Sequence, residues 1–149
     1  MSTLYGVNKT LSNTGTVNTI EPEMQGAKLK WFFDTYTFLT TEAAGDVIQL
    51  MGNPLPAEGR VADWVIDHGN LDNNRTLEFG TLADPNEFMD AVDCGAGAAA
   101  KKTMQVNGVA GSAGFKIASG DGQTPTLTLA GGAAAAVQVR VGILIATKG

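Results

Sequence analysis

Apolar and polar residues alternate along much of this chain, and the alternation is most regular near its end. β-Branched residues occupy every second position of the last stretch: Val137, Val139, Val141, Ile143 and Ile145. A strand places these five side chains on one face, whereas a helix distributes them around its circumference. Leucine alternates with threonine in 124–130, and Gly131 and Gly132 lie between the two stretches, as a tight turn requires. The pattern therefore predicts a terminal hairpin of two strands.

Four earlier segments also have the composition or the alternation of strands: 28–40, 47–51, 60–68 and 76–81. The residues of the last two segments that we expect to face the core are Ala62, Trp64, Ile66, Leu77 and Phe79. One or two further short strands are expected within 106–119, where glycines interrupt the pattern.

The segment 28–40 differs from the others because both of its faces carry large apolar side chains. The two faces consist of Leu29, Trp31 and Phe33 on one side and of Phe32, Tyr36 and Phe38 on the other. Two interpretations remain open. Either a bulge exchanges the faces of this strand, or the second face meets another subunit.

The sequence contains one clear helix start. Asp84 is a suitable N-cap, Pro85 suits the first helical position, and Glu87 stands where a capping-box glutamate is expected. A helix of about two turns is therefore predicted, ending at Gly95. With seven or eight strands separated by Gly, Pro and Asn, the fold class is all-β. We expect an antiparallel β-sandwich or jelly roll with one short helix.

The first 26 residues do not fit this pattern. They are polar and irregular, and their apolar residues have no regular spacing: Leu4, Tyr5, Leu11, Val17 and Ile20. Such a segment is either a frayed terminus or an extended arm that becomes ordered against a partner. We therefore divide the chain into an extended N-terminal arm, residues 1–26, and a β-sandwich domain, residues 27–149.

Composition narrows the range of functions. The chain has 149 residues, a net charge of −5 and no basic cluster longer than Lys101–Lys102, which argues against nucleic-acid binding. No apolar run approaches the length of a transmembrane helix, and the N-terminus does not resemble a signal peptide. We expect that the protein is synthesised in the cytoplasm and that it does not associate with a membrane. The single cysteine, Cys94, is interpreted as a small buried apolar residue.

The residues that usually carry catalysis are sparse. His68 is the only histidine, and the small-residue stretch 110–114 around Ser112 lacks the first glycine of a nucleophile elbow. The stretch 95–103 lacks the glycine that a phosphate-binding loop has before its lysine. No spacing of His, Cys, Asp and Glu favours a metal. The sequence therefore predicts no enzyme, no cofactor and no metal site.

Several short stretches occur in an order that resembles one protein family: 45–50, 54–61, 63–66, 77–80 and 85–88, followed by the turn at 127–132 and the valine-rich last strand. In this order the chain resembles the capsid decoration (cement) proteins of tailed bacteriophages. The resemblance covers roughly residues 45–148. It implies a jelly-roll-like sandwich on the outer capsid surface that binds and bridges subunits of the major capsid protein.

The resemblance also implies self-association. A homotrimer is expected, with a homodimer as the alternative, because threefold joints of a capsid lattice recruit threefold partners. The residues expected to contact the capsid are the apolar residues of the arm and two prolines of the loop after 47–51: Leu4, Tyr5, Leu11, Val17, Ile20, Pro54 and Pro56.

A second function stays open at this point. A carbohydrate-binding jelly-roll module of a phage adsorption or surface protein has the same fold class. Trp31, Tyr36 or Trp64 would then stack on a sugar, although the core is the expected place of both tryptophans.

Overall fold

The computed structural model describes residues 28–39, 43–51, 54–72, 75–95, 100–130 and 136–147. These residues form, in chain order, β1 (Lys28–Thr37), β2 (Val47–Gln49), β3 (Arg60–His68), β4 (Thr76–Thr81), β5 (Met89–Asp93), β6 (Lys101–Thr103), α2 (Met104–Asn107), the 3-10 turn η2 (Asp121–Gln123), β7 (Pro125–Ala130) and β8 (Gln138–Thr147). The residues expected to form the arm, 1–26, lie outside this part of the chain.

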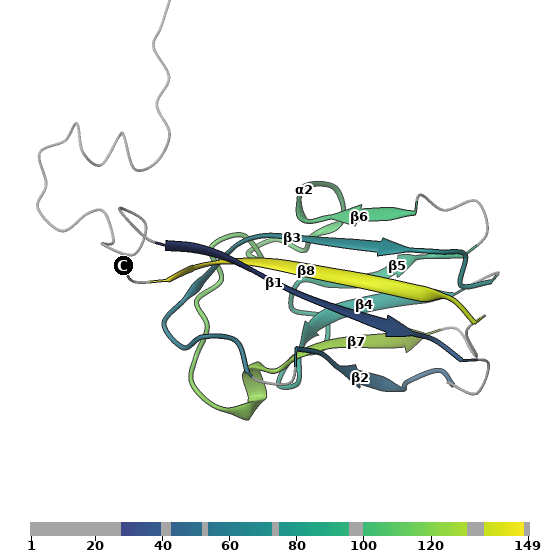
Figure 1. Ribbon diagram of the computed structural model, residues 1–149, viewed down its shortest axis with the longest axis horizontal. Helices are drawn as coiled ribbons and strands as arrows, with labels where there is room; N and C mark the ends of the chain where they lie inside the picture. Colours follow the sequence, from purple (N-terminus) through teal and green to yellow (C-terminus); the bar gives the residue numbers. More distant parts are fainter. Residues whose placement is uncertain are drawn as a thin grey trace, which may run out of the picture.

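The eight strands form two antiparallel four-stranded sheets, one in front of the other (Figure 1). The first sheet has the order β1–β8–β3–β6, and the second sheet has the order β2–β7–β4–β5. Apart from β4 and β5, consecutive strands lie in different sheets, so that the chain crosses repeatedly between the layers. This arrangement is the topology of a jelly roll, and the predicted fold class is confirmed.

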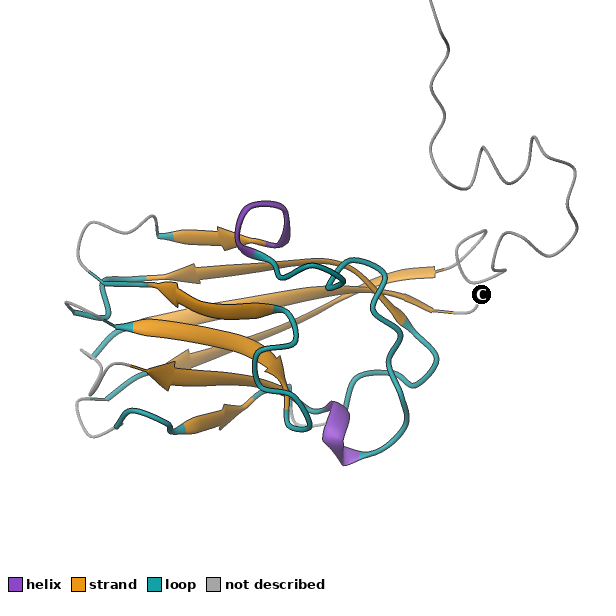
Figure 2. Cartoon of the chain, turned by 180° about the vertical axis from the view of Figure 1, so that it is seen from behind, coloured by secondary structure: helices purple, strands orange, loops and turns teal. Residues whose placement is uncertain are grey.

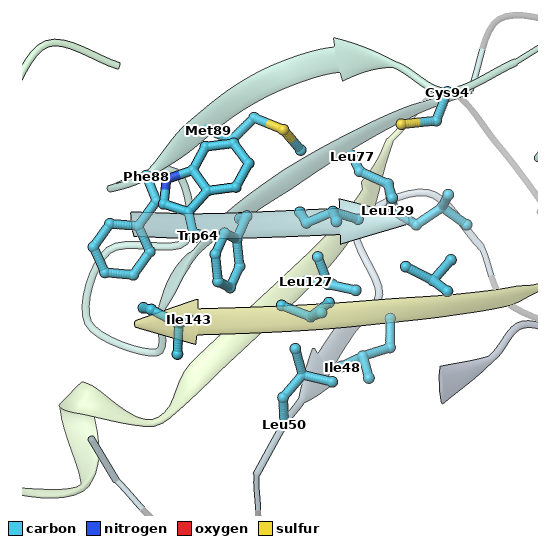
Figure 3. Packing of buried hydrophobic residues seen from close by; sticks show 14 of the residues in the cluster. Ile48, Leu50, Trp64, Leu77, Phe88, Met89, Cys94, Leu127, Leu129 and Ile143 are labelled. Carbon is cyan, nitrogen blue, oxygen red and sulfur yellow. The ribbon is translucent and has the colours of Figure 1, made fainter. Parts of the chain in front are cut away.

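The core lies between the two sheets and is filled by alternate side chains of the strands (Figure 3). Several positions expected to be apolar and inward are completely buried: Trp64, Ile66, Leu77, Phe79, Val139, Val141 and Ile143. The Trp64 ring of the first sheet meets the Phe79 ring of the second edge to face, at 5.5 Å between centroids. Burial of one such side chain stabilises the fold by about 1.5–3 kcal/mol, so this layer holds the sheets together.

The predicted terminal hairpin is wrong. β7 pairs with β2 and β4 in the second sheet, whereas β8 pairs with β1 and β3 in the first. β7 is a central strand, and Thr126, Leu127 and Leu129 show that both of its faces are covered. Alternation identifies a strand and its buried face, but it does not identify the neighbouring strand. Gly131 and Gly132 lie outside the described residues.

The helix predicted after Asp84 is also wrong. Only its first turn resembles one, since the amide of Glu87 donates to the Asp84 carbonyl oxygen at 3.2 Å. The next amide, of Phe88, donates instead to the Phe79 carbonyl oxygen at 2.9 Å, and β5 continues the second sheet from Met89. Pairing with β4 buries Phe88 and Met89 completely and therefore overrides the local helix signal.

Two smaller predictions also change. No strand forms within 106–119. A single isolated bridge joins Lys116 to Arg60 there, and the one α-helix of the described residues, α2, begins just before this segment. The pairing of β3 with β8 shifts between Val61 and Asp63, which marks a β-bulge. Val61 is therefore buried, and Ala62, expected in the core, is exposed.

Candidate interaction surface

The outer face of the first sheet carries an exposed apolar stripe on β1. The stripe consists of Leu29, Trp31 and Phe33, whose side chains are 63%, 40% and 51% exposed. The pairing of β1 with β8 is continuous from end to end, so no bulge exchanges the faces of this strand. Of the two interpretations from the sequence, the bulge is therefore excluded. The expectation that Trp31 belongs to the core is wrong.

The opposite side of β1 faces the second sheet. Phe38 is completely buried, and Phe32 and Tyr36 pack against the core as half-buried side chains. Asp34, on the same side, accepts a hydrogen bond from the backbone amide of Met51 at 2.6 Å. This bond ties β1 to the start of the loop after β2, so that the apolar stripe stands on a firmly held strand.

A glycine lets the aromatic rings of the apolar stripe lie down on the sheet. Gly142 of β8 is the pairing partner of Phe33, and a Cβ at this position would lie 2.5 Å from Cε1 of the Phe33 ring. The Arg140 guanidinium lies over the Phe33 ring at 5.0 Å. Trp31 and Phe33 stack on each other at 5.4 Å with planes 16° apart. The two rings therefore form one stacked, exposed group.

A hollow lies beside the stripe, at the end of the sheet where β1 begins and β8 ends. Its volume is about 360 Å³, and it is lined by Arg60, Val61, Ala62, Ala113, Gly114 and Ala146. Ala146 lines the hollow and is the pairing partner of Leu29, so the hollow lies directly beside the apolar stripe. The bulge at Ala62 and the small side chains around it leave the space open.

The other end of this outer face is charged. Lys101 of β6 and Asp67 of β3 approach to 3.9 Å, and Arg140 lies opposite Asp67 in the register of β8. A second hollow of about 320 Å³ lies here, lined by Asp67, His68, Ala100, Lys101, Gln138 and Arg140. The outer face is thus apolar at one end and carries both signs of charge at the other.

Pro54 and Pro56 lie in the loop that joins β2 to β3, with Pro54 exposed and Pro56 half-buried. Two hydrogen bonds hold the loop. The amide of Leu55 donates to the Gln123 carbonyl oxygen at 3.1 Å, and the amide of Glu58 donates to the Ile117 carbonyl oxygen at 2.9 Å. Long loops gather at this end of the sandwich, where β1 begins (Figure 2). The structure therefore brings the two prolines to the same end as the hollow.

The five arm residues expected to bind a partner, Leu4, Tyr5, Leu11, Val17 and Ile20, lie outside the described residues. Of the residues proposed for sugar stacking, Trp64 is completely buried and thus excluded, and Tyr36 is half-buried. The hollow was missed from the sequence. One signal was present for the stripe: a glycine at 142 inside a β-branched strand marks a close approach of another group.

The outer side of the second sheet has a different character. The described parts of its strands and adjoining loops contain one arginine, Arg75, and no lysine. Carboxylates predominate there: Asp46, Glu78, Asp84, Glu87, Asp90 and Asp93. The loop before β5 covers Gly80 of β4, where a Cβ would lie 2.6 Å from the Pro85 carbonyl carbon. Burial, together with a hydrogen bond to Asp84 and the charge of Asp84, raises the pKa of Glu87.

The groups that a hydrolase needs are far apart. Ser112 is buried in the loop that pairs with Val61 at the start of β3, and His68 ends the same strand. Seven residues of extended chain separate the two ends, roughly 20 Å. In the part of the chain that the structure describes, no three His, Cys, Asp or Glu side chains gather as metal ligands, and no helix is long and apolar enough to span a membrane.

One solved structure has the same arrangement over most of its length. A chain of the cyanophage Pam1 capsid asymmetric unit superposes on this chain with a TM-score of 0.67 at 18% sequence identity, covering 83% of this chain and 87% of that chain. At this identity the likeness shows a shared fold. No family model and no curated protein sequence matches the chain.

Proposed function

We propose that this chain is a structural virion protein of a bacteriophage, which decorates the outer surface of the capsid and stabilises it by bridging major capsid protein subunits. The observation that carries the proposal is the fold shared with a chain of the cyanophage Pam1 capsid asymmetric unit. The likeness covers more than four fifths of both chains, so the two chains have similar lengths and most of the sandwich takes part in the match.

The character of the molecule supports a mechanical role. A capsid-bridging protein needs a stable body and adhesive surfaces, and it needs no catalytic site. The jelly roll supplies the body, and the apolar stripe on its first sheet supplies an adhesive surface. The proposed assembly is a homotrimer, with a homodimer as the alternative, because a symmetric oligomer presents the same contact to several neighbouring capsid subunits at once.

Attachment to the capsid is assigned to the arm and the adjacent loop. The arm, residues 1–26, is too polar to form a core of its own, but its scattered apolar residues can each fill a shallow pocket on a lattice of subunits. Because the described chain begins at Lys28 of β1, the arm leaves from the end of the sandwich that also carries Pro54 and Pro56. Arm and loop therefore approach the same partner.

The test is binding to purified phage capsids that lack this protein. The full chain is mixed with such particles, pelleted with them, and located on them by electron cryomicroscopy. We expect saturable binding and new density on the outer surface, with capsids that withstand more heat or chelator than undecorated ones. Particles that already carry the protein are the control and should bind none. Absence of binding by folded protein would overturn the proposal.

A second function is favoured by one observation. The near-parallel rings of Trp31 and Phe33 form an exposed aromatic surface, which is the usual platform for a sugar. A carbohydrate-binding module of a phage adsorption or surface protein is therefore the alternative. A glycan array separates the two functions, since a decoration protein binds capsids and leaves the array empty.

A further inference from the structure

We propose that the outer face of the first sheet is the surface through which copies of this chain associate, with the apolar stripe of one copy seated in the hollow of the next. The inference rests on the proposed function in one respect, because it names the surface that holds the proposed oligomer together. The occupant of this face is a second copy of the chain.

The first argument concerns the position of the apolar stripe. Among the described residues, β1 is an outermost strand of the first sheet, and it is ten residues long. The other outermost strands, β2, β5 and β6, have three, five and three residues. A long outermost strand with exposed aromatic residues is a favourable place for another chain to bind. The position of the stripe therefore favours a partner on this side of the sandwich.

The second argument is that the face holds both halves of a contact. Leu29 and Trp31 project from it, and the hollow of about 360 Å³ lies next to Leu29 through their shared neighbour Ala146. A hollow of this volume accepts a leucine or a tryptophan ring. A surface that presents a projection beside a matching recess is complementary to itself, as a twofold contact between identical chains requires, so this contact favours the homodimer among the two proposed assemblies.

Charge provides the third argument. The chain has a net charge of −5, so two copies repel each other over most of their surfaces. On this face, by contrast, the charges nearly balance, with Arg60, Lys101 and Arg140 against Asp63 and Asp67. The excess of carboxylates lies on the second sheet instead. Two copies therefore meet with the least repulsion when their first sheets face each other.

Size distinguishes a second copy from a sugar. The three side chains of the stripe expose roughly 300 Å² together, given their exposed fractions and the usual area of such residues. Specific interfaces bury about 800 Å² on each partner, with a few aromatic residues at the centre and a polar rim. The stripe, the hollow and the charged end together supply this anatomy. In addition, the Phe33 ring already has Arg140 over it and Gly142 beside it, which leaves less of the ring open to a sugar.

The experiment compares the mass of the full chain with that of three variants by sedimentation velocity over a dilution series. W31T/F33T replaces the rings by β-branched residues, which suit a strand, and A62W fills the hollow from an exposed position. V47T is the matched control, because Val47 is a strand residue that is 45% exposed on the second sheet. Circular dichroism and the melting temperature show whether each variant folds.

We expect an oligomer for the wild type and for V47T. Both variants should weaken association by about 100-fold or more, since W31T/F33T removes the projecting rings and A62W blocks the hollow that receives them. A wild type that stays monomeric at the highest concentration, or two folded variants that associate as tightly as the wild type, would overturn the inference. If W31T/F33T does not fold, A62W decides.

Failure of this inference is separable from failure of the proposed function. An oligomer that W31T/F33T dissociates, but that does not bind capsids, supports the surface and contradicts capsid decoration. A monomer that binds capsids supports decoration and contradicts the surface. A glycan bound at Trp31 in the absence of self-association contradicts both.

Discussion

Gly80 and Gly142 both lie inside strands, but a side chain at these two positions would meet different obstacles. At Gly80 a Cβ would collide with backbone, lying 2.6 Å from the Pro85 carbonyl carbon and 2.7 Å from the Glu87 nitrogen. At Gly142 the nearest atoms are those of the Phe33 ring, which is half exposed to solvent. A backbone segment held on both sides cannot move away, whereas a surface ring can rotate outward.

Gly80→Ala is therefore expected to destabilise the fold by about 2–3 kcal/mol, because the loop before β5 must lift from the second sheet. Gly142→Ala should cost about 1 kcal/mol or less, since only the Phe33 ring has to move. Urea denaturation of the two variants and the wild type measures both effects. Equal losses of stability would show that the loop is not packed against Gly80 as described.

Cys94 gives a second prediction at the scale of one residue. Burial, opposed in part by the positive charge of Lys102, raises the pKa of the Cys94 thiol to about 11. At pH 8 roughly one thiol in a thousand is then ionised, and the side chain is closed to reagents. We expect reaction with a thiol reagent only as fast as the fold opens, with full reactivity in denaturant. Rapid labelling of the native protein would contradict this burial.

At the scale of elements, the loop that precedes β5 combines a turn with a half-buried acid, Glu87. The amide of Asp84 donates to the Thr81 carbonyl oxygen at 3.1 Å, and the amide of Thr81 donates back to the Asp84 carbonyl oxygen at 2.9 Å. This closed turn places Glu87 beside Asp84 over the second sheet. The two carboxyl groups share a hydrogen bond, so protonation of Glu87 strengthens the loop.

The pH dependence of stability follows from the raised pKa of Glu87. The folded chain takes up this proton at a higher pH than the unfolded chain, whose glutamate titrates near 4.5. The contribution of Glu87 to stability is therefore present at pH values below 4.5 and is lost as the pH rises through the higher pKa of the folded state. Glu87→Gln should be more stable relative to the wild type at neutral pH than at acid pH.

Melting temperatures of Glu87→Gln and the wild type across the acid range test this expectation. Asp84→Asn is the informative companion variant, because it removes the charge beside Glu87 and leaves the burial in place. It should reduce the pH dependence without abolishing it. A difference between Glu87→Gln and the wild type that is the same at every pH would contradict the assignment.

Six of the eight strands in the described residues, all except β5 and β6, were predictable from the sequence, but the partners of the strands were not. The alternation in 60–68 and 76–81 reflects which side of each strand is buried. It can therefore be recognised within each segment alone. The hairpin at 131–132 and the helix at 84–94 failed for a different reason. The partners of β7 and β5 are decided by contacts such as Phe79 with Met89, between side chains from separate segments.

At the scale of the whole molecule, the two sheets give the sandwich two unlike sides. One side is apolar with balanced charges, and the other is acidic. The stripe was visible in the sequence as a second apolar face of 28–40. The hollow was not visible, because it arises where the bulge at Ala62 meets Ala113 and Gly114, which are about fifty residues away in the chain.

The arm leads to the last prediction, which concerns the assembled particle. Ordering the arm against a capsid costs about 1–2 kcal/mol per residue in backbone entropy, so that one arm alone binds modestly. An oligomer with two or three arms regains affinity, since the second contact forms within an already bound molecule. In the part of the chain that the structure describes, the core and the apolar stripe consist of residues from β1 onward.

Deletion of residues 2–24 should therefore leave the melting temperature and the oligomeric mass unchanged, and should remove most binding to undecorated capsids. Pelleting with capsids measures the binding, and sedimentation velocity measures the mass. The matched variant P54A/P56A, in the full chain, tests the loop at the same end of the sandwich. If the truncated chain binds as tightly as the full chain while P54A/P56A does not, attachment runs through the loop 54–59, and the first residues are only a terminus.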